Sequence, residues 1–376
     1  MAEPGPASAP ADGPAGGPAG GPALTGPVEI VGTGLLGTSI GLALRRAGLE
    51  VLLTDRSPDH VRTASGLGAG RATTPVDRPQ LVVVAVPPDH LGAVIRDALE
   101  RTAGHGAVVT DVGSVKAGPL AAVAGLAGVE RYVGGHPMAG SERSGPLAAS
   151  AALFDGRPWA VTPHDRADPG AVALVEQLAR LTGAVVVPLP PAEHDRAVAR
   201  TSHVPHLLSS LVAGRLADAP EDHLALSGQG VRDVTRVAAG DPQLYGQIVS
   251  ANADAVLDLL AEVRQQLDTL IDAVAGADRD RLETLLAQGV AGTQAIPGKH
   301  GGPVRPMRSV FVSVPDHPGE LARLFAAAGT AEVNIEDVRI DHDPGRPVGL
   351  VELVVDETLA EQLLGSLESQ GWVTHR

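Results

Sequence analysis

One stretch decides the fold of the N-terminal half of this chain: Val28-Glu-Ile-Val-Gly32-Thr-Gly34-Leu-Leu-Gly37. Four residues typical of a β-strand are followed by three glycines with the spacing GxGxxG. A helical pattern begins within this motif, at Leu35, and continues to Ala47. Gly32 permits a tight turn, Gly34 lets backbone amides approach a pyrophosphate, and Gly37 lets the helix pack closely on the strand. The unpaired N–H groups at the start of that helix would face the diphosphate. The motif therefore predicts a dinucleotide-binding turn.

Asp55 favours NAD over NADP as the cofactor. It follows Gly37 by 18 residues, at the end of the second expected strand, where a carboxylate accepts hydrogen bonds from the adenosine ribose hydroxyls. The alternative cofactor is NADP, because the guanidinium of the adjacent Arg56 could bind its 2′-phosphate. The predicted cofactor-binding residues are Gly32, Gly34, Leu35, Leu36, Gly37, Asp55, Val86 and Pro87.

Short apolar strands alternate with helical runs through the first half of the chain. The expected elements are Val28–Val31, Leu35–Ala47, Val51–Thr54, Leu81–Val86, Leu91–Leu99 and Val108–Val112. This alternation is typical of an α/β domain in which helices cover a parallel sheet. Together with the glycine motif, it predicts a Rossmann-type NAD-binding domain over residues 27–190.

The β pattern disappears from about His194 to Ala291, where helical periodicity takes over. The longest helical run, Val249–Asp272, carries apolar residues at helical spacing. An all-helical second domain is therefore predicted over residues 191–295. A Gly- and Pro-rich linker, residues 296–306, ends it.

The remaining residues, 307–376, are expected to form an independent module. Its predicted elements are, in order, strand Ser309–Val314, helix Gly319–Ala328, strands Asn334–Ile340 and Val348–Val355, helix Leu359–Gln370 and strand Trp372–Thr374. This βαββαβ order predicts a ferredoxin-like fold.

Composition excludes several classes of function. Lys and Arg total 29 against 44 Asp and Glu, and the net charge of -15 argues against a nucleic-acid-binding surface. The absence of cysteine excludes disulfides and thiolate metal sites. Residues 1–26 are almost all Ala, Gly and Pro, so we expect a disordered extension and not a signal peptide. No apolar run approaches the length of about 18 residues that a membrane span needs, and a cytoplasmic protein is expected.

Six further motifs carry a family resemblance. They are Val86-Pro87-Pro88, Thr110-Asp-Val-Gly-Ser114-Val-Lys116, Gly134-Gly-His136-Pro-Met-Ala-Gly-Ser-Glu142, His194-Asp195, Ser202-His203-Val-Pro-His206 and Arg232-Asp233-Val-Thr-Arg236-Val-Ala238. With these runs, residues from about Pro27 to Ala291 resemble the prephenate dehydrogenases and arogenate dehydrogenases of tyrosine biosynthesis. The C-terminal module resembles an ACT domain, through Val314-Pro-Asp-His-Pro-Gly-Glu-Leu321 and Val333-Asn334-Ile335.

The resemblance implies an NAD-dependent oxidative decarboxylation of prephenate to 4-hydroxyphenylpyruvate, with arogenate, which would give tyrosine, as the alternative substrate. His136 matches the catalytic histidine, and an imidazole is suited to accept the 4-hydroxyl proton near neutrality. Ser114 matches the serine that hydrogen-bonds the same hydroxyl. Arg236 matches the arginine that binds a substrate carboxylate. The other implied substrate-binding residues are His194, His203, His206, Glu142 and Asp233. A homodimer formed by the helical domain is also implied.

The ACT resemblance implies an aromatic amino-acid effector, with tyrosine the first to test. The loop before the predicted helix could receive a carboxylate on its backbone amides. The implied effector-binding residues are Asp316, His317, Gly319, Asn334 and Ile335.

Several of these residues also have simpler interpretations. His203 and His206 have helical spacing that a metal could use, but no HExxH motif or cysteine accompanies them, so no metal is predicted. Ser114 could merely cap a helix that begins near Lys116, and Lys116 could favour the cofactor phosphates or remain exposed. Arg236 could be a solvated helix charge. The rival functions are a 3-hydroxyacid dehydrogenase and a non-catalytic sensor of NAD and an amino acid.

Overall fold

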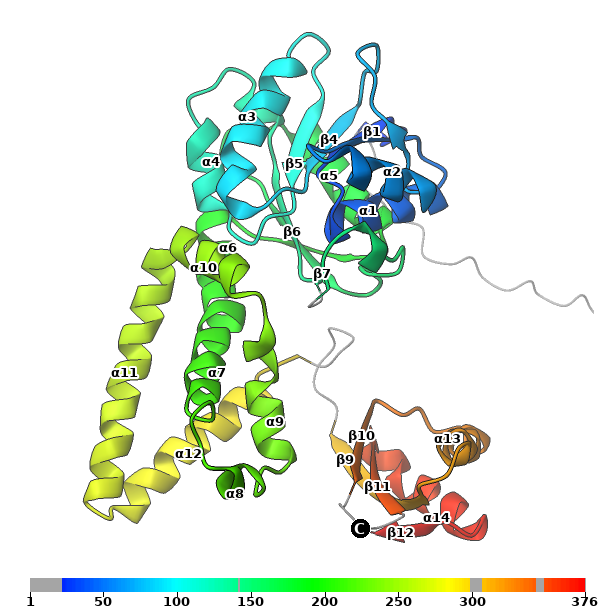
Figure 1. Ribbon diagram of the computed structural model, residues 1–376, viewed down its shortest axis with the longest axis vertical. Helices are drawn as coiled ribbons and strands as arrows, with labels where there is room; N and C mark the ends of the chain where they lie inside the picture. The colour runs from blue at the N-terminus through cyan, green and yellow to red at the C-terminus, as the bar shows by residue number, and fades with distance from the viewer. Residues whose placement is uncertain (1–21, 141–142, 298–305, 343–347, 376) are drawn as a thin grey trace, which may run out of the picture. The chain divides into compact units, whose positions relative to one another are not determined.

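The computed structural model describes residues 22–140, 143–297, 306–342 and 348–375 (Figure 1). Most of the predicted N-terminal extension, most of the linker, and Glu142 lie outside the described residues. The chain divides into two compact units. The first contains the residues up to Ala225 together with Val234–Gln265, and the second contains Leu226–Asp233 and the residues from Gln266 onward.

The first unit is built around a five-stranded parallel sheet with the strand order β3-β2-β1-β4-β5. Its strands are β1 (Val28–Val31), β2 (Val51–Thr54), β3 (Arg71–Ala72), β4 (Leu81–Val84) and β5 (Val108–Asp111). The order reverses between β1 and β4, and ligands of such sheets bind at the carboxyl ends of the strands beside that point. The predicted Rossmann-like arrangement is confirmed. The expected strand Leu81–Val86 ends two residues early, before the Pro87-Pro88 pair.

Helices cover both faces of this sheet, and the side chains of β4 show how. Leu81 and Val83 pack in one apolar core, whereas Val82 and Val84 pack in the other. All four are fully buried, as expected for a central parallel strand. The helices of this part are α1 (Leu35–Arg46), α2 (Pro58–Gly66), α3 (Leu91–Arg101), α4 (Ala117–Val123) and α5 (Pro169–Leu181).

A second, three-stranded sheet lies in the same unit and was not predicted. It has the order β6-β7-β8, with β6 (Gly134–Pro137) antiparallel to β7 (Pro158–Thr162) and β7 parallel to β8 (Val185–Pro188). The sequence of β6 conceals a strand because it is Gly-Gly-His-Pro. Glycine is needed there for a close approach: a Cβ atom at Gly135 would lie 2.8 Å from the Asp111 main-chain oxygen.

Helices follow from residue 191, as predicted. They are α6 (Pro191–Val198), α7 (Val204–Gly214), α8 (Glu221–Leu224), α9 (Gln229–Thr235), α10 (Pro242–Ala251), α11 (Ala253–Ala275) and α12 (Arg279–Gln294), with a π turn at Ala199–His203. The expected continuous helix Val249–Asp272 is wrong, because Asn252 interrupts it between α10 and α11. Among the described residues, none of the helices has the length and apolar character needed to cross a membrane.

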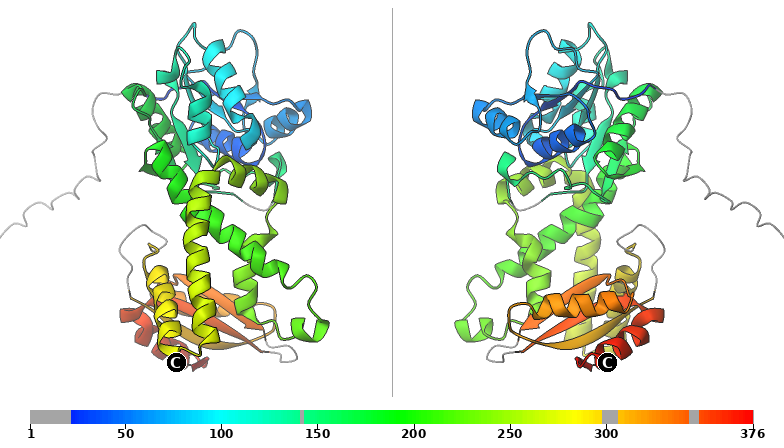
Figure 2. Two further views of the ribbon diagram at one scale, coloured as in Figure 1. Left: turned by 90° about the vertical axis from the view of Figure 1, so that its left-hand side faces the viewer. Right: turned by 90° about the vertical axis from the view of Figure 1, so that its right-hand side faces the viewer.

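The C-terminal part has the predicted βαββαβ order, and its antiparallel sheet has the strand order β10-β11-β9-β12. The elements are β9 (Met307–Pro315), α13 (Glu320–Thr330), β10 (Asp337–His342), β11 (Val348–Asp356), α14 (Ala360–Ser369) and β12 (Val373–His375). Helices α13 and α14 pack on one face of this sheet (Figure 2). Val312 and Leu353 of the sheet share an apolar core with Leu324 and Leu363 of the two helices. The strand expected from Asn334 begins at Asp337, so Asn334 and Ile335 precede it.

Candidate active site

The three glycines of the first motif differ in what surrounds them. A Cβ atom at Gly32, where φ is +102°, would lie 2.3 Å from the Ala85 main-chain oxygen, and one at Gly37 would lie 1.9 Å from the Gly32 oxygen. At Gly34, by contrast, a Cβ atom would meet nothing within 4 Å. Packing therefore requires the first and third glycines. The second borders open space at the N-terminus of α1, and this fits the pyrophosphate of a dinucleotide.

Asp55 lies at the end of β2 and faces this turn. Its Oδ2 atom accepts hydrogen bonds from the Thr33 amide (2.7 Å) and hydroxyl (3.1 Å), and its Oδ1 atom accepts one from the Ser57 amide (2.8 Å). Burial alone would raise the pKa of Asp55, but the Thr33 and Ser57 hydrogen bonds hold it below its ordinary value. The carboxylate is thus ionised and accepts only. The neighbouring Arg56 is exposed.

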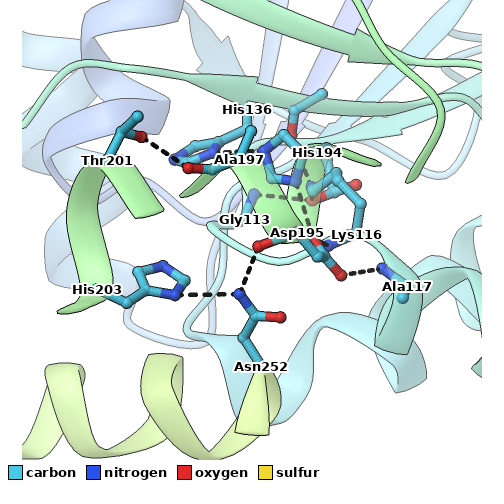
Figure 3. Close-up of polar contacts among 12 residues, drawn as sticks. Gly113, Lys116, Ala117, His136, His194, Asp195, Ala197, Thr201, His203 and Asn252 are labelled. Atoms are coloured by element: carbon cyan, nitrogen blue, oxygen red, sulfur yellow. Dashed lines mark hydrogen bonds and ion pairs between the residues drawn. The ribbon is translucent and has the colours of Figure 1, made fainter. Parts of the chain in front are cut away.

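His136, His194 and Asp195 form a chain of hydrogen bonds (Figure 3). His136 comes from β6, and its Nδ1 atom lies 2.9 Å from Nε2 of His194 on α6. Nδ1 of His194 lies 2.8 Å from Oδ1 of Asp195. The Asp195 carboxylate also accepts the backbone N–H groups of Lys116 and Ala117, each at 2.8 Å. It therefore satisfies the first amides of α4 from a distant part of the sequence.

The direction of these hydrogen bonds decides where His136 carries its proton. A carboxylate only accepts, so Nδ1 of His194 donates to Asp195, and in a neutral His194 ring Nε2 is then the acceptor. Nδ1 of His136 must then be the donor, which leaves Nε2 of His136 with its lone pair free. Burial, followed by the nearby His194, Lys116 and His203, holds the pKa of His136 well below its ordinary value. His136 is therefore a neutral base with a defined tautomer.

A buried ion pair lies beneath the strand that carries His136. The Lys116 ammonium group contacts Asp111 Oδ1 and donates to the Gly135 main-chain oxygen at 2.6 Å. The Tyr132 hydroxyl donates to Asp111 Oδ2 at 2.7 Å. Burial lowers the pKa of Lys116, and burial together with Asp111 raises the pKa of Tyr132 well above its ordinary value. Of the two alternatives left open for Lys116, an exposed side chain is wrong, because Lys116 is 1% exposed.

Ser114 is half-buried in the loop between β5 and α4. The alternative that it caps a helix is wrong, because Lys116 occupies the N-cap position of α4 and the Asp195 carboxylate supplies the capping oxygens. Ser114 therefore has no capping duty that would explain it.

His206, on α7, stacks on the ring of Tyr245 from α10. The ring centroids are 3.4 Å apart and the planes differ by 6°. Burial lowers the pKa of His206, and among the described residues its buried Nδ1 atom has no hydrogen-bond partner. A cavity of about 320 Å³, large enough for a small ligand, adjoins the pair. Its lining includes His206, Ser210, Gly240, Tyr245 and Ser250.

The comparisons with known proteins agree with this geometry. Residues 40–188 match the model for the nucleotide-binding domain of prephenate dehydrogenase, and residues 190–288 match the model for its dimerization domain. A probable prephenate dehydrogenase of Streptomyces niveus, NovF, is 37% identical over 91% of this chain and 98% of its own length. This chain belongs to the prephenate dehydrogenase family. It is an NAD-dependent oxidoreductase, as the family is.

Two solved structures of the family superpose on the chain. One is prephenate dehydrogenase from Aquifex aeolicus in complex with hydroxyphenyl propionate and NAD⁺, with a TM-score of 0.64 and 28% identity over 72% of this chain and 98% of that one. The other is arogenate dehydrogenase from Synechocystis, with a TM-score of 0.59 and 28% identity over 71% of this chain and 98% of that one.

The structure tells less about three other residues that the family resemblance suggests. Arg236 lies in a 3₁₀ turn (Arg236–Ala239) and is exposed; among the described residues it has no ion-pair partner. The Asp233 carboxylate accepts a hydrogen bond from Gln229, one turn earlier on α9, at 3.0 Å. Glu142 is outside the described residues. The roles of these three residues stay predictions.

The predicted effector residues lie in two loops of the C-terminal part. Asp316, His317 and Gly319 lie between β9 and α13, and Gly319 has the left-handed backbone conformation with φ +95°. Asn334 donates to Glu336 at 2.6 Å, and Ile335 packs against the apolar core.

Two functional candidates, Asn252 and Tyr245, were missed from the sequence. Asn252 acts through a partner far away along the chain, so no local pattern marks it. Asp195 was noted in the His194-Asp195 motif without a role, because its partners at the start of α4 lie 78 and 79 residues away. The only sign of Tyr245 in the sequence was its rarity, because the chain contains 2 tyrosines.

Proposed function

We propose that this chain oxidises and decarboxylates prephenate, producing 4-hydroxyphenylpyruvate, CO₂ and NADH. The observation that carries the proposal is the free Nε2 lone pair of His136, held in place by the His136–His194–Asp195 chain. In the proposed reaction, Nε2 takes the proton of the substrate's 4-hydroxyl group. Bound NAD⁺ supplies the acceptor for the hydride that leaves the same carbon. The ring then loses its carboxylate as CO₂ and becomes aromatic, and His136 returns the proton to the phenolate oxygen.

Ser114 and Arg236 have proposed roles in placing the substrate. The Ser114 hydroxyl is assigned to the 4-hydroxyl of the substrate, since it is half-buried after β5 and has no capping role. Arg236 is assigned to a substrate carboxylate, because its guanidinium is exposed and offers a bidentate donor. Within the described part of the chain, Nδ1 of buried His206 has no hydrogen-bond partner, and this supports a ligand contact in the neighbouring cavity.

Arogenate is the second candidate substrate. It differs from prephenate in carrying an amino group where prephenate has a keto group, and the Synechocystis arogenate dehydrogenase shares the fold. Initial rates of NADH formation with each substrate decide between them. A higher kcat/KM for arogenate would overturn the assignment of prephenate. His136→Asn serves as the control, since its rate should fall by about 10²–10⁴-fold while NAD⁺ still binds.

We also propose that the enzyme is a homodimer. The matched dimerization domain supports this, as do the exposed aliphatic side chains of α11 and α12. These side chains include Leu257, Leu267, Ile271, Val274, Leu286 and Val290, each more than half exposed. Sedimentation equilibrium tests the proposal, and a monomer at micromolar concentration would overturn it.

The C-terminal part is proposed to be an ACT domain that binds tyrosine. Its βαββαβ order and the Asp316–Gly319 loop support this. An effector acts only through different affinities for two states, so removal of residues 297–376 should leave dehydrogenase activity but abolish any response to tyrosine. Inhibition of the truncated enzyme with unchanged potency would show that tyrosine binds in the active site instead.

A further inference from the structure

Asn252 connects the long helix α11 to the histidine cluster, here defined as His136, His194 and His203. It is 5% exposed and ends α10, with φ -119° and ψ 31°. Its side chain extends away from both helices that it separates. Its Nδ2 atom lies 2.8 Å from the main-chain oxygen of Asp195 and 3.1 Å from Nδ1 of His203 (Figure 3).

These two contacts determine which atoms carry hydrogen. The Asp195 main-chain oxygen can only accept, so the side-chain atom of Asn252 facing it must be the amide nitrogen. The same NH₂ group faces His203, and an amide nitrogen only donates. Nδ1 of His203 is therefore an unprotonated acceptor. The ring proton of neutral His203 then lies on Nε2.

The surroundings of His203 keep it neutral. It is 1% exposed. Burial lowers its pKa to about 4, and His194 and His206 add to the effect while the Asp195 carboxylate opposes it. At neutral pH the His203 ring is therefore neutral and carries one N–H proton, on either Nδ1 or Nε2.

We propose that Asn252 is a positioning residue for this cluster. Through the Asp195 main chain it fixes the residue that orients His194 and His136, and through His203 it selects the tautomer that presents an N–H donor at Nε2. The proposal rests on the proposed function only for its kinetic consequence. The tautomer of His203 is a property of the folded chain, whatever substrate the enzyme uses.

The test compares Asn252→Asp with a matched control. The carboxylate has nearly the same size as the amide, but it only accepts, so it repels the Asp195 carbonyl and requires a proton on Nδ1 of His203. Gln243→Glu makes the same amide-to-carboxylate change at an exposed position on α10. Two-bond ¹H–¹⁵N spectra of histidine-labelled full-length enzyme report the tautomer, with the His203 signals assigned by their loss in His203→Gln. Steady-state rates and NAD⁺ affinity complete the comparison.

In the native enzyme at pH 7 we expect His203 to be protonated on Nε2 and not on Nδ1. In Asn252→Asp we expect a protonated Nδ1 and a kcat/KM at least tenfold lower, with NAD⁺ affinity within twofold of native; Gln243→Glu should match native in all three. A native His203 protonated on Nδ1 would overturn the proposal, even if Asn252→Asp failed to fold. A changed tautomer with native kcat/KM would also overturn it. If no substrate is turned over, the proposed function fails, but the spectra still decide the tautomer.

Discussion

Nδ1 of His136 and Nε2 of His194 lie 2.9 Å apart, and this contact leaves the opposite nitrogen of His136 free to accept a proton. The arrangement depends on the Asp195 carboxylate. It accepts a hydrogen bond from Nδ1 of His194, and it also accepts the two backbone N–H groups at the start of α4. One residue therefore joins helix stability to the protonation pattern of the base.

Asp195→Asn should separate these two duties. The amide keeps the size of the carboxylate but offers an NH₂ group in place of one accepting oxygen, so the tautomer of His194 and hence that of His136 is no longer enforced. We expect kcat to fall by about 10²-fold or more, within the range that general-base catalysis contributes. Steady-state kinetics at saturating NAD⁺ measures the loss.

Asp168→Asn is the control for Asp195→Asn, because Asp168 caps α5 with its side chain and has no link to the histidines. Asp168→Asn should change the stability by less than about 1 kcal/mol and leave kcat unchanged, because asparagine and aspartate are comparable N-cap residues. Equal kcat values in the two variants would contradict the role given to Asp195.

Gly34→Ala and Gly37→Ala test the dinucleotide turn. A Cβ atom at Gly34 enters open space, so Gly34→Ala should fold with a native Tm but bind NAD⁺ at least tenfold more weakly. A Cβ atom at Gly37 would collide with the backbone of Gly32, so Gly37→Ala should be strongly destabilised. Thermal denaturation and titration with NAD⁺ measure both effects. If Gly34→Ala bound NAD⁺ with native affinity, the pyrophosphate would not bind next to Gly34.

The ion pair of Lys116 and Asp111 should show strong coupling. Removing one partner leaves the other charge buried, so Lys116→Met and Asp111→Asn should each cost about 3–5 kcal/mol of stability. The double variant should cost clearly less than their sum. Urea denaturation of the four proteins in the cycle measures the coupling. Costs that add within about 0.5 kcal/mol would mean that the two groups are not energetically linked.

Acid should destabilise the fold through His203. Its pKa is about 4 in the folded chain but about 6.5 in the unfolded one. Between these values the unfolded chain binds the extra proton, so the free energy of unfolding falls as the pH is lowered through this window. Urea denaturation at pH 7, 6 and 5 tests this, and His203→Gln should show a shallower decline. A decline as steep in the variant as in the native chain would assign the effect to other groups.

The elements that the sequence predicted are those with local signals. Val28–Val31 and Val51–Thr54 are apolar strands, and both occur with the expected bounds. β6 was missed because its strand conformation depends on the close approach of Gly135 to Asp111, which a propensity cannot reveal. The continuous helix across Asn252 was wrong because that side chain bonds to partners about 50 residues away.

The histidines of the site were predicted from the sequence, but the residues that support them were not. The family motifs identified His136, His194 and His203, which the structure brings into one cluster. The burial of Lys116 and the capping of α4 by Asp195 depend on chain segments that meet only in the folded state, so spacing in the sequence could not predict them.

The His136–His194–Asp195 chain also has a consequence for the order of events during folding. Its contacts join residues 58 and 79 positions apart, on β6, α6 and α4. Contacts between residues this distant form late, because the intervening loops must close first, whereas helices assemble locally and quickly. In a refolding experiment, helical signal should therefore return before the ability to reduce NAD⁺, and a chain that has collapsed without joining these segments should be catalytically silent.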